Sequence, residues 1–587
     1  MVGIVLEIER EAAAEEIANK FDSWNNQRDP KMAEIKELRD YTFATDTTKT
    51  TNAELPWKNT TTIPKLCQIR DNLHANYMAA LFPNDDWLKW EGYGEEDESA
   101  EKSQAIRTYM ANKLRESNFR TTVSQLLYDY IDTGNVFATS IYEDNYTLDP
   151  DTNEKIQQYV GPRAVRRAIQ DVVFNPMAVS YEKSPKIFRT LKSIGELVEE
   201  IETKPEMQYN KQILQDVINL RGRIAGMSAD DSIKNDSFQV DGFGSITEYY
   251  GSGVVEILEF KGDMYDVITG EFLKDYVITV VDRTHVIRKV PNPSWLGSRN
   301  EVHAGWRLRS DNLYAMGPLD NLVGMQYRMD HLENLKADAL DQTIHPPKII
   351  RGNVEEFEWG PDAEIYVGDD GAVEIMPPNP AAFQVNNEIA VIANTMEEMA
   401  GAPKQAMGIR TPGEKTAFEV QQLSNAASRI FQEKITNFEV NVLEPLLNAM
   451  FESAKRNLDG TDVARVMDDD LGVVQFLKIT KEDITAKGKL RPMGARHFAA
   501  TAQLIQNLSS ALQIVGGDTS VMSHVSGKKI AALFFEEIPG LERFDLVQDN
   551  IRLIEQAETQ RMMNQIQEDL EVEAQTPVEG EDVEGLV

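Results

Sequence analysis

Two proline pairs constrain the fold of this chain more than any other feature of its sequence. Pro346-Pro347 and Pro377-Pro378 enclose a short segment of mixed character, and helical patterns flank that segment on both sides. Because a proline disfavours helical geometry in the residue before it, the first helix, expected over 317–342, must end before the first pair. The second helix, expected over 386–400, carries apolar residues on one face. The sequence therefore predicts two separate helices joined by a non-helical excursion.

The segment between these helices is acidic. From Gly352 to Met376 it contains eight acidic residues and neither lysine nor arginine. The eight are Glu355, Glu356, Glu358, Asp362, Glu364, Asp369, Asp370 and Glu374. Two interpretations stay open, a solvated loop or a carboxylate surface that faces partner proteins or lines a passage for DNA. Neither interpretation makes the segment an active site.

The bulk composition excludes several classes of protein. At 587 residues the chain exceeds one compact core, so several domains or an elongated subunit are expected. Its 60 basic and 96 acidic residues leave a net charge of −36, which argues against indiscriminate coating of nucleic acid. Cys67 is the only cysteine, so neither an intrachain disulfide nor a cysteine-based zinc site is expected.

The sequence predicts neither a membrane span nor a secretory signal. No stretch approaches 18 consecutive apolar residues, and the first residues become acidic after eight positions. We therefore expect a protein made in a reducing cytoplasm. The scan for catalytic and cofactor motifs gives no candidate that survives, so no enzyme activity, metal or cofactor is expected.

Helical periodicity recurs along most of the chain. It extends over 1–40, 63–82, 97–133, 184–224 and 492–562. A helix of unusual length is expected over 416–456, and Pro445 inside it is expected to introduce a kink, since proline lacks the N–H and crowds the previous turn. After Arg561 the remaining 26 residues contain eight acids and no base, which predicts a disordered tail over 563–587.

Strand patterns interrupt the helices at three places. A helix should give way to a strand at Gly134, and "DVVFNP" at 171–176 reads as a strand stopped by Asn-Pro. Residues 253–290 are rich in valine, isoleucine, tyrosine and phenylalanine, with a turn at Thr269-Gly270, and predict three or four antiparallel strands. The expected fold class is α+β, mostly α.

The glycine-containing stretch 408–416 resembles the phosphate-binding loop of an NTPase, with one residue too many. Glu414 stands between the second glycine and Lys415, which moves the lysine out of register and adds a carboxylate. Thr416 and Glu419 instead match the T-x-x-E capping box that begins a helix. The stretch is therefore interpreted as a loop followed by a helix start.

Two further clusters have both a functional and a structural interpretation. Asp468-Asp469-Asp470 could suggest a two-metal site, but adjacent acids on a regular element cannot all face one ion, which favours a surface turn. The cluster Arg163, Arg166 and Arg167 could contact DNA, although a solvated edge before the 171–176 strand is the more common case.

The order of these elements resembles the portal protein, or head-to-tail connector, of short-tailed double-stranded DNA bacteriophages. The residues that carry the resemblance are "YAMGPLDNLVGMQYRMDHLENLKADALDQTIHPPKII" (314–350), "GAPKQAMGIRTPGEKTAFEVQQLSNAASRI" (401–430) and "VLEPLLNAMFE" (442–452). "YDYIDTGNVFATSIYE" and "DVVFNP" agree with the family's N-terminal half more loosely. One departure is Thr-Ala-Phe-Glu at 416–419, where the family commonly has Thr-Ala-Thr-Glu.

The resemblance implies a division of the chain into portal regions. These are a wing (1–316), a first stem helix (317–345), a clip (346–384), a second stem helix (385–400), a tunnel loop (401–415), a long kinked wing helix with a return segment (416–491), a helical crown (492–562) and the acidic tail (563–587). The eight clip acids would then dock partner proteins. Lys404, Gln405, Arg410 and Lys415 would face DNA from the tunnel loop.

The resemblance also implies the function. Usually twelve copies form a ring at one capsid vertex of the virion, and double-stranded DNA is packaged and ejected through its channel. The implied partners are further copies of the chain, the terminase motor, the tail adaptor, and the major capsid and scaffolding proteins. The alternatives are a packaging-associated NTPase, which would need a Walker B strand that the sequence does not offer, and a helical head–tail adaptor without a channel.

The charges of the 401–415 stretch generate a prediction. Lys404, Arg410 and Lys415 outnumber Glu414, so a ring of subunits would present a cationic collar inside an otherwise acidic channel. Replacing both Lys404 and Arg410 with alanine should lower the amount of DNA retained in packaged particles and leave subunit assembly intact, as a nuclease-protection assay would measure. Unchanged retention would contradict a role for these two cations on DNA and would favour the alternative, in which they cap neighbouring helices or pair between subunits.

Overall fold

The computed structural model describes the residue ranges 5–8, 13–50, 55, 58–82, 87–94, 100–148, 155–203, 208–225, 253–293, 300–344, 346, 348–352, 366–375, 384–401, 430–458, 461–468 and 473–493. Helices and strands are mixed throughout these ranges. The chain divides into two compact units, Met1–Arg465 with Phe476–Arg496, and Val466–Gln475 with His497–Val587. Only short strand segments of the second unit are described, so the fold below is that of the first.

A six-stranded sheet forms one part of the first unit. Its strand order is β5-β6-β7-β8-β9, and β1 pairs with β7 in parallel. The strands are β1 (Val5–Ile8), β5 (Val172–Phe174), β6 (Lys186–Ser193), β7 (Val254–Asp266), β8 (Phe272–Val281) and β9 (His285–Pro291). The antiparallel strands β7 to β9 confirm the strand prediction for 253–290.

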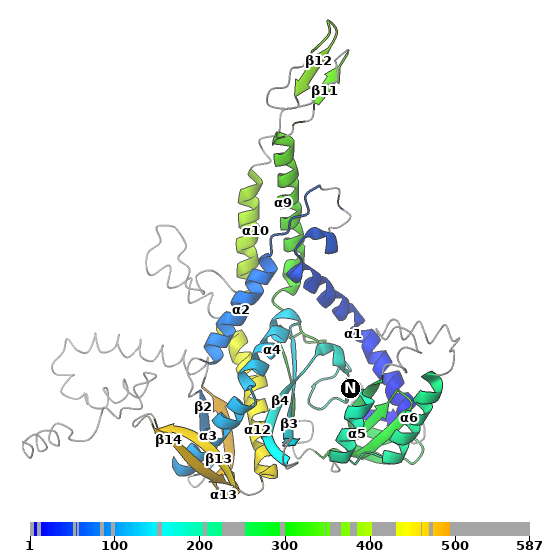
Figure 1. The fold of residues 1–587 in the computed structure, drawn as a ribbon, viewed down its shortest axis with the longest axis vertical. Helices are drawn as coiled ribbons and strands as arrows, with labels where there is room; N and C mark the ends of the chain where they lie inside the picture. Colours follow the sequence, from blue (N-terminus) through cyan, green and yellow to red (C-terminus); the bar gives the residue numbers. More distant parts are fainter. Residues whose placement is uncertain are drawn as a thin grey trace, which may run out of the picture. The chain divides into compact units, whose positions relative to one another are not determined.

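Helices cover both faces of this sheet. Because successive side chains of a strand point to opposite faces, neighbouring residues of β7 contact different helices. Leu258 of β7 joins a cluster with Phe21 of α1 (Ala13–Phe43). Its neighbour Ile257 instead joins a cluster with Leu197 of α5 (Ile194–Thr203) and Leu214 of α6 (Lys211–Ala225). The sheet is therefore the middle layer between α1 and the α5–α6 pair (Figure 1).

Two local helix predictions are wrong in this region. Residues 5–8, inside the predicted helical range 1–40, form β1, and residues 186–193, inside 184–224, form β6. β6 pairs with β7 only as far as Lys186 opposite Lys261, and β1 takes the place beside β7 from Asp263 to Asp266. Both strands form because β7, far along the chain, offers unpaired backbone groups, which local periodicity does not reveal.

A second part of the first unit surrounds a three-stranded sheet with helices. The sheet has the order β10-β3-β4, with β3 (Asn135–Leu148), β4 (Lys155–Arg167) and β10 (Glu301–Gly305). The helices are α2 (Lys65–Leu81), α3 (Ala100–Glu116), α4 (Phe119–Asp132) and α12 (Glu444–Asn457). They share one large apolar core, and α2, α3 and α4 confirm the helices predicted in 63–82 and 97–133.

The remaining elements are short or belong to the hairpin described below. They are the 3-10 turns η1 (Thr47–Lys49), η3 (Ile169–Asp171) and η6 (Asp320–Leu322), the strand pairs β2 (Leu88–Gly92) with β15 (Gly488–Pro492) and β13 (Thr461–Asp468) with β14 (Val473–Thr480), and the single turn α13 (Lys481–Ile484).

The described part of the long C-terminal helix contains an irregular turn. It runs from 430 to Asn457, and η8 (Glu439–Leu443) within it is a π-helical turn. Pro445 follows directly, in the first turn of α12. A π turn is one of the ways in which a helix accommodates a residue that cannot donate to the hydrogen-bond ladder. The start of the predicted helix, 416–429, lies outside the described residues, and the kink at Pro445 stays a prediction.

The corner between α4 and β3 depends on a close approach of two glycines. Gly134 has a φ of +72°, and a Cβ placed on it would lie 2.3 Å from the backbone nitrogen of Gly317. Its carbonyl accepts a hydrogen bond from the Trp306 amide at 2.9 Å. Only glycine satisfies both the left-handed geometry and the contact, which confirms the predicted change from helix to strand at this position.

Replacing Gly134 with alanine should therefore lower the free energy of unfolding by about 3 kcal/mol, from left-handed strain and the clash together. Gly324 is the matched control, because it lies in a helix and a Cβ added to it would have nothing within 4 Å. Gly324→Ala should raise stability by about 0.5 to 1 kcal/mol. Denaturant unfolding measures both changes, and equal effects for the two variants would contradict the close approach.

Candidate functional site

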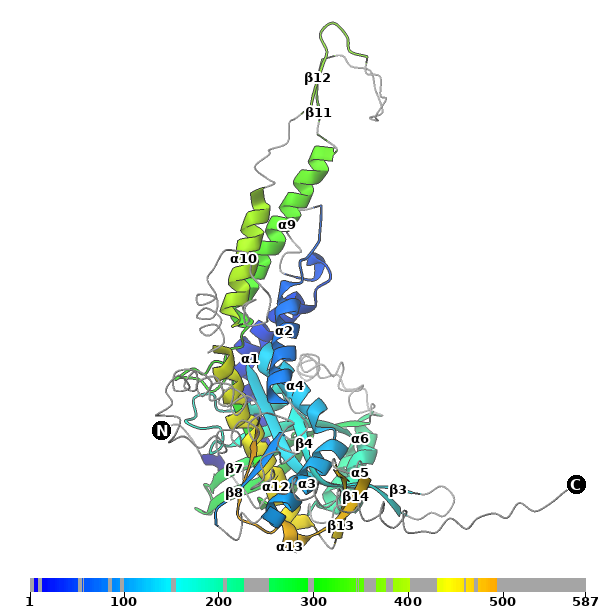
Figure 2. The same ribbon diagram turned by 90° about the vertical axis from the view of Figure 1, so that its left-hand side faces the viewer.

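Two helices form a hairpin that begins at the core and ends in a small β-hairpin. The helices α9 (Val323–Ile344) and α10 (Val385–Met399) lie side by side, and β11 (Lys348–Arg351) and β12 (Ala372–Ile375) lie beyond their far ends (Figures 1 and 2). The second helix lies within one residue of its predicted range, whereas the first begins at Val323 instead of 317, after the turn η6, and ends at Ile344, just before the first proline pair. Their assignment as stem helices stays a prediction.

The lower end of α10 packs on the large apolar core. Met396 is fully buried in that core, and Ile389, Ile392 and Ala393 pack against it. At the other end, the Lys336 ammonium of α9 donates to the Asn386 side chain at 3.2 Å. Since α10 begins at Val385, the last two turns of α9 extend past its partner.

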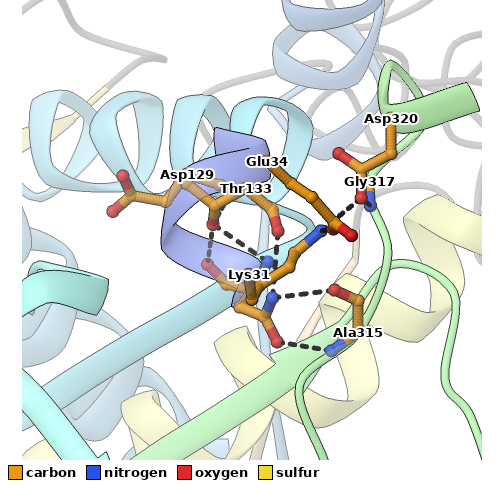
Figure 3. Close-up of polar contacts among 8 residues, drawn as sticks. Lys31, Glu34, Asp129, Thr133, Ala315, Gly317 and Asp320 are labelled. Atoms are coloured by element: carbon orange, nitrogen blue, oxygen red, sulfur yellow. Dashed lines mark hydrogen bonds and ion pairs between the residues drawn. The ribbon is translucent and has the colours of Figure 1, made fainter. Parts of the chain in front are cut away.

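The chain that leads into α9 is held by polar contacts with α1 and β3. Lys31 of α1 forms an ion pair with Asp320 at the start of η6, and the Asp320 carboxylate also accepts from the Gly317 amide at 3.0 Å (Figure 3). The Asn135 side chain of β3 bonds both backbone groups of Ala315, at 2.8 and 3.0 Å. These bonds fix the position at which the hairpin leaves the rest of the first unit, which we call the body.

One face of α9 carries four polar residues at four-residue spacing, namely Gln326, Asp330, Asn334 and Asp338. Residues four apart lie above one another on an α-helix, so their side chains form a single stripe. The stripe binds an extended segment, residues 58–66, which ends in the first residues of α2. We call this segment the strap.

The lower part of the stripe binds the strap in a buried environment. The Asp330 carboxylate accepts from the Ile63 amide at 3.0 Å, the Thr62 hydroxyl at 2.9 Å and the Gln326 side chain at 2.9 Å. Gln326 also donates to the Ile63 carbonyl at 2.6 Å and accepts from the Leu66 amide at 3.3 Å. Asp330 and Gln326 are both fully buried.

The upper part of the stripe binds the strap closer to solvent. The Asn334 side chain donates to the Thr61 carbonyl at 2.9 Å. The Asp338 carboxylate accepts from the Lys58 amide at 3.2 Å, the Asn59 amide at 3.0 Å and the Asn59 side chain at 2.8 Å. The Asn59 side chain also reaches Asp341 at 2.9 Å.

A mostly buried ion pair connects α2 to α10. The Lys65 ammonium contacts the Glu397 carboxylate, and both side chains are at most 10% exposed. The same ammonium donates to the Gln68 side chain at 2.9 Å. The base of the hairpin is thus tied to the body through both of its helices.

The upper part of the hairpin exposes apolar side chains. No residue of α9 after Asn334 is buried. Leu335 is 45% exposed and Ile344 68%, and Val391 on α10 is 60% exposed. Single exposed apolar residues are ordinary, but a series along one thin element is typical of a surface that another protein covers.

The β-hairpin beyond the helices is exposed in the part that the structure describes. Lys348–Arg351 pairs antiparallel with Ala372–Ile375, and none of the described side chains in this pair is buried. Ile350 is 54% exposed, and Tyr366 and Val367 beside the turn are also exposed. A two-stranded hairpin alone is marginally stable in water.

The structure describes three of the eight predicted clip acids. Asp369 and Asp370 lie in the turn before β12 and are exposed, and Glu374 of β12 lies 3.8 Å from Arg351 of β11. The other five lie outside the described residues, namely Glu355, Glu356, Glu358, Asp362 and Glu364.

Several other predictions fall outside the described residues and stay predictions. They concern Lys404, Gln405, Arg410, Lys415, Thr416, Glu419, the acids Asp469 and Asp470, the crown from 494 onward and the acidic tail. The strap and its stripe, in contrast, are features that sequence reasoning missed. The four-residue spacing of amide and carboxylate side chains was the available signal.

The arginine cluster of β4 is occupied by the protein's own groups. Arg163 pairs with Glu143 at 2.6 Å, and Arg166 forms two bonds with Asp129 at 2.5 and 2.6 Å. The Arg167 guanidinium lies over the Phe188 ring at 5.6 Å. These contacts favour the structural interpretation of the cluster over a DNA contact.

Within the described ranges, no helix combines the length and the apolar character that a membrane span requires. The same ranges bring together no group of three or more histidine, cysteine, aspartate or glutamate side chains suited to a metal ion. The chain matches no protein-family model, and no curated protein matches it. The function is therefore inferred from the residues and their geometry alone.

Asp330 is a buried carboxyl surrounded by hydrogen-bond donors. Burial raises the pKa of this carboxyl above its usual range, and the bonds from Ile63, Gln326 and Thr62 oppose that rise without cancelling it. A carboxyl with a raised pKa binds its proton more tightly in the folded than in the unfolded chain. Its contribution to stability is therefore largest below the usual aspartate pKa of about 3.9 and is lost as the pH rises through the raised value.

Replacing Asp330 with asparagine should leave stability at pH 7 unchanged or slightly raised. The Oδ1 atom, which takes the Ile63 and Gln326 bonds, is retained, and the Thr62 hydroxyl can turn to accept from the new amide. Asp330→Ala should instead lower the free energy of unfolding by about 2 kcal/mol or more, because buried donors lose their acceptor. Denaturant titrations at pH 7 and pH 5 would compare the two, and a large loss in the asparagine variant would contradict the account of this carboxyl.

Proposed function

We propose that this chain is the portal subunit of a short-tailed, double-stranded DNA bacteriophage. In this proposal the α9–α10 hairpins of neighbouring subunits stand side by side in a ring and line the channel through which DNA is packaged and ejected. The β11–β12 tips form the clip, which binds the packaging motor and later the tail adaptor. The subunit has no catalytic role of its own.

One observation carries the proposal: the hairpin exposes apolar side chains and ends in a β-hairpin in which no described side chain is buried. Leu335, Ile344 and Val391 are exposed in the single chain, as is Ile350 at the tip. Copies of the same element on both sides would bury these side chains and supply the tip with packing partners. A ring provides such neighbours for every subunit with one repeated interface.

The charge of the chain agrees with a conduit for a polyanion. A net charge of −36 and the acids of the turn at Asp369 and Asp370 would keep DNA from adhering to the wall. The cations expected at Lys404 and Arg410 would then be the local exception. A helical adaptor without a channel would explain the long helices, but it gives no reason for an acidic tip beyond a thin helical hairpin.

The proposed contacts can be tested with paired charge substitutions. Leu335→Glu with Val391→Glu should convert a ring into free subunits in sedimentation velocity, because buried carboxylates at the interface would be desolvated without partners. Val179→Glu is the matched control, since Val179 is 84% exposed on the loop between β5 and β6 and outside the hairpin. It should leave assembly unchanged.

Circular dichroism distinguishes loss of assembly from loss of folding. The double variant should keep its helical signal because both side chains are already largely exposed in the single chain. A folded double variant that sediments like the unmodified protein would overturn the proposed role of the hairpin faces.

A further inference from the structure

We propose that the strap, residues 58–66, braces the α9–α10 hairpin and fixes its direction. We further infer that the strap detaches from α9 first at its upper end, near Lys58. The inference concerns the single subunit and does not depend on ring formation. It rests on where the core ends, on how the strap is held, and on the exposure of its bonds.

The apolar core supports only the lower part of α9. Met329 and Leu332 are its last buried apolar residues, and Asn334 is its last buried residue of any kind. Above that point α9 has α10 beside it only about as far as the contact between Lys336 and Asn386. Its polar stripe continues on the other side to Asp338, four residues beyond Asn334, and the strap continues with it. The strap therefore extends the support of α9 beyond the reach of the core.

A segment that braces a helix must itself be rigid, and the strap is held on two sides. One side lies on the stripe of α9. On the other side the Thr47 amide of η1 donates to the Thr60 carbonyl at 2.9 Å, and Asp46 and Thr61 form an antiparallel bridge. At its lower end the strap continues into α2, where Lys65 pairs with Glu397. A lateral movement of α9 would break bonds to a segment that is anchored independently.

The hydrogen bonds between the strap and α9 differ in exposure along the strap. The bond from the Leu66 amide to Gln326 is buried, and those from Thr62 and Ile63 reach the fully buried Asp330. The bonds from the Lys58 amide to Asp338 and from the Asn59 side chain to Asp341 are exposed. Water can replace an exposed hydrogen bond at little cost, but a buried one leaves an unsatisfied group. Opening should therefore begin at Lys58 and Asn59 and stop at the buried Asn334, which holds the Thr61 carbonyl.

The hairpin therefore has two conformational states. With the whole strap bound, α9 is braced up to Asp338. With the upper strap detached, the helix is braced only as far as Asn334, and the part above is free to change direction while the core stays closed. Asp338 distinguishes the two states, because its carboxylate accepts hydrogen bonds from the Lys58 amide, the Asn59 amide and the Asn59 side chain.

The test measures the distance between the body and the top of the hairpin. Spin labels at Lys36→Cys on α1 and Thr343→Cys on α9, in a Cys67→Ser background, report this distance by pulsed electron resonance, with labelled subunits diluted by unlabelled ones. Both labelled positions are exposed, and Cys67 is the only native cysteine. Asp338→Ala should broaden the distance distribution, and Glu388→Ala, which removes an exposed acid of α10, should leave it unchanged.

Hydrogen exchange on the same variants identifies the cause. In Asp338→Ala the amides of Lys58 and Asn59 should exchange about tenfold faster, while the Leu66 amide keeps its protection. If the upper amides lose protection and the distance distribution does not broaden, the strap does not brace the hairpin. If those amides remain protected, Asp338 does not hold the strap. Either result overturns the inference.

Discussion

The hydrogen bonds between the polar stripe of α9 and the strap are the interaction on which the rest of this structure depends. A hairpin that leaves the core is positioned by contacts near its base, and here polar contacts accompany the apolar packing of Met329 and Met396. Asp330 accepts three bonds in a buried setting, and the pairs Lys31–Asp320 and Lys65–Glu397 hold the flanking elements. Buried ionic groups contribute little net stability because of their desolvation, but they are directional, so they fix a geometry that apolar packing alone would leave loose.

Because its base is fixed, the α9–α10 hairpin presents its exposed upper part in a defined direction. The upper α9–α10 faces and the β11–β12 tip carry apolar groups that are exposed in the described part of the single chain, at a place where the proposed neighbouring copies would cover them. The same top carries the acids of the turn at Asp369 and Asp370. A fixed direction, an interface for further copies and a negatively charged end are the features that the proposed DNA conduit would require of its subunit.

Much of this architecture could be predicted from the sequence, and the rest could not for physical reasons. Proline pairs mark the ends of α9 and α10 because proline acts locally, and Gly134 marks the α4–β3 corner because its φ is positive. The strand β6 was missed because its partner is β7, some 70 residues away. The stripe was missed because Asp330 and Asn334 look like solvent-facing residues until the strap, more than 260 residues earlier in the chain, is placed against them.

The central claim is that the chain assembles into a ring with an open channel. Native mass spectrometry of the purified protein, with negative-stain images of the same sample, tests it most directly. The account predicts a species of about 0.8 MDa, twelve times the 66.2 kDa chain, with a stain-filled central hole. A closed assembly without a hole, or a protein that stays monomeric even when its scaffolding and capsid proteins are supplied, would contradict it.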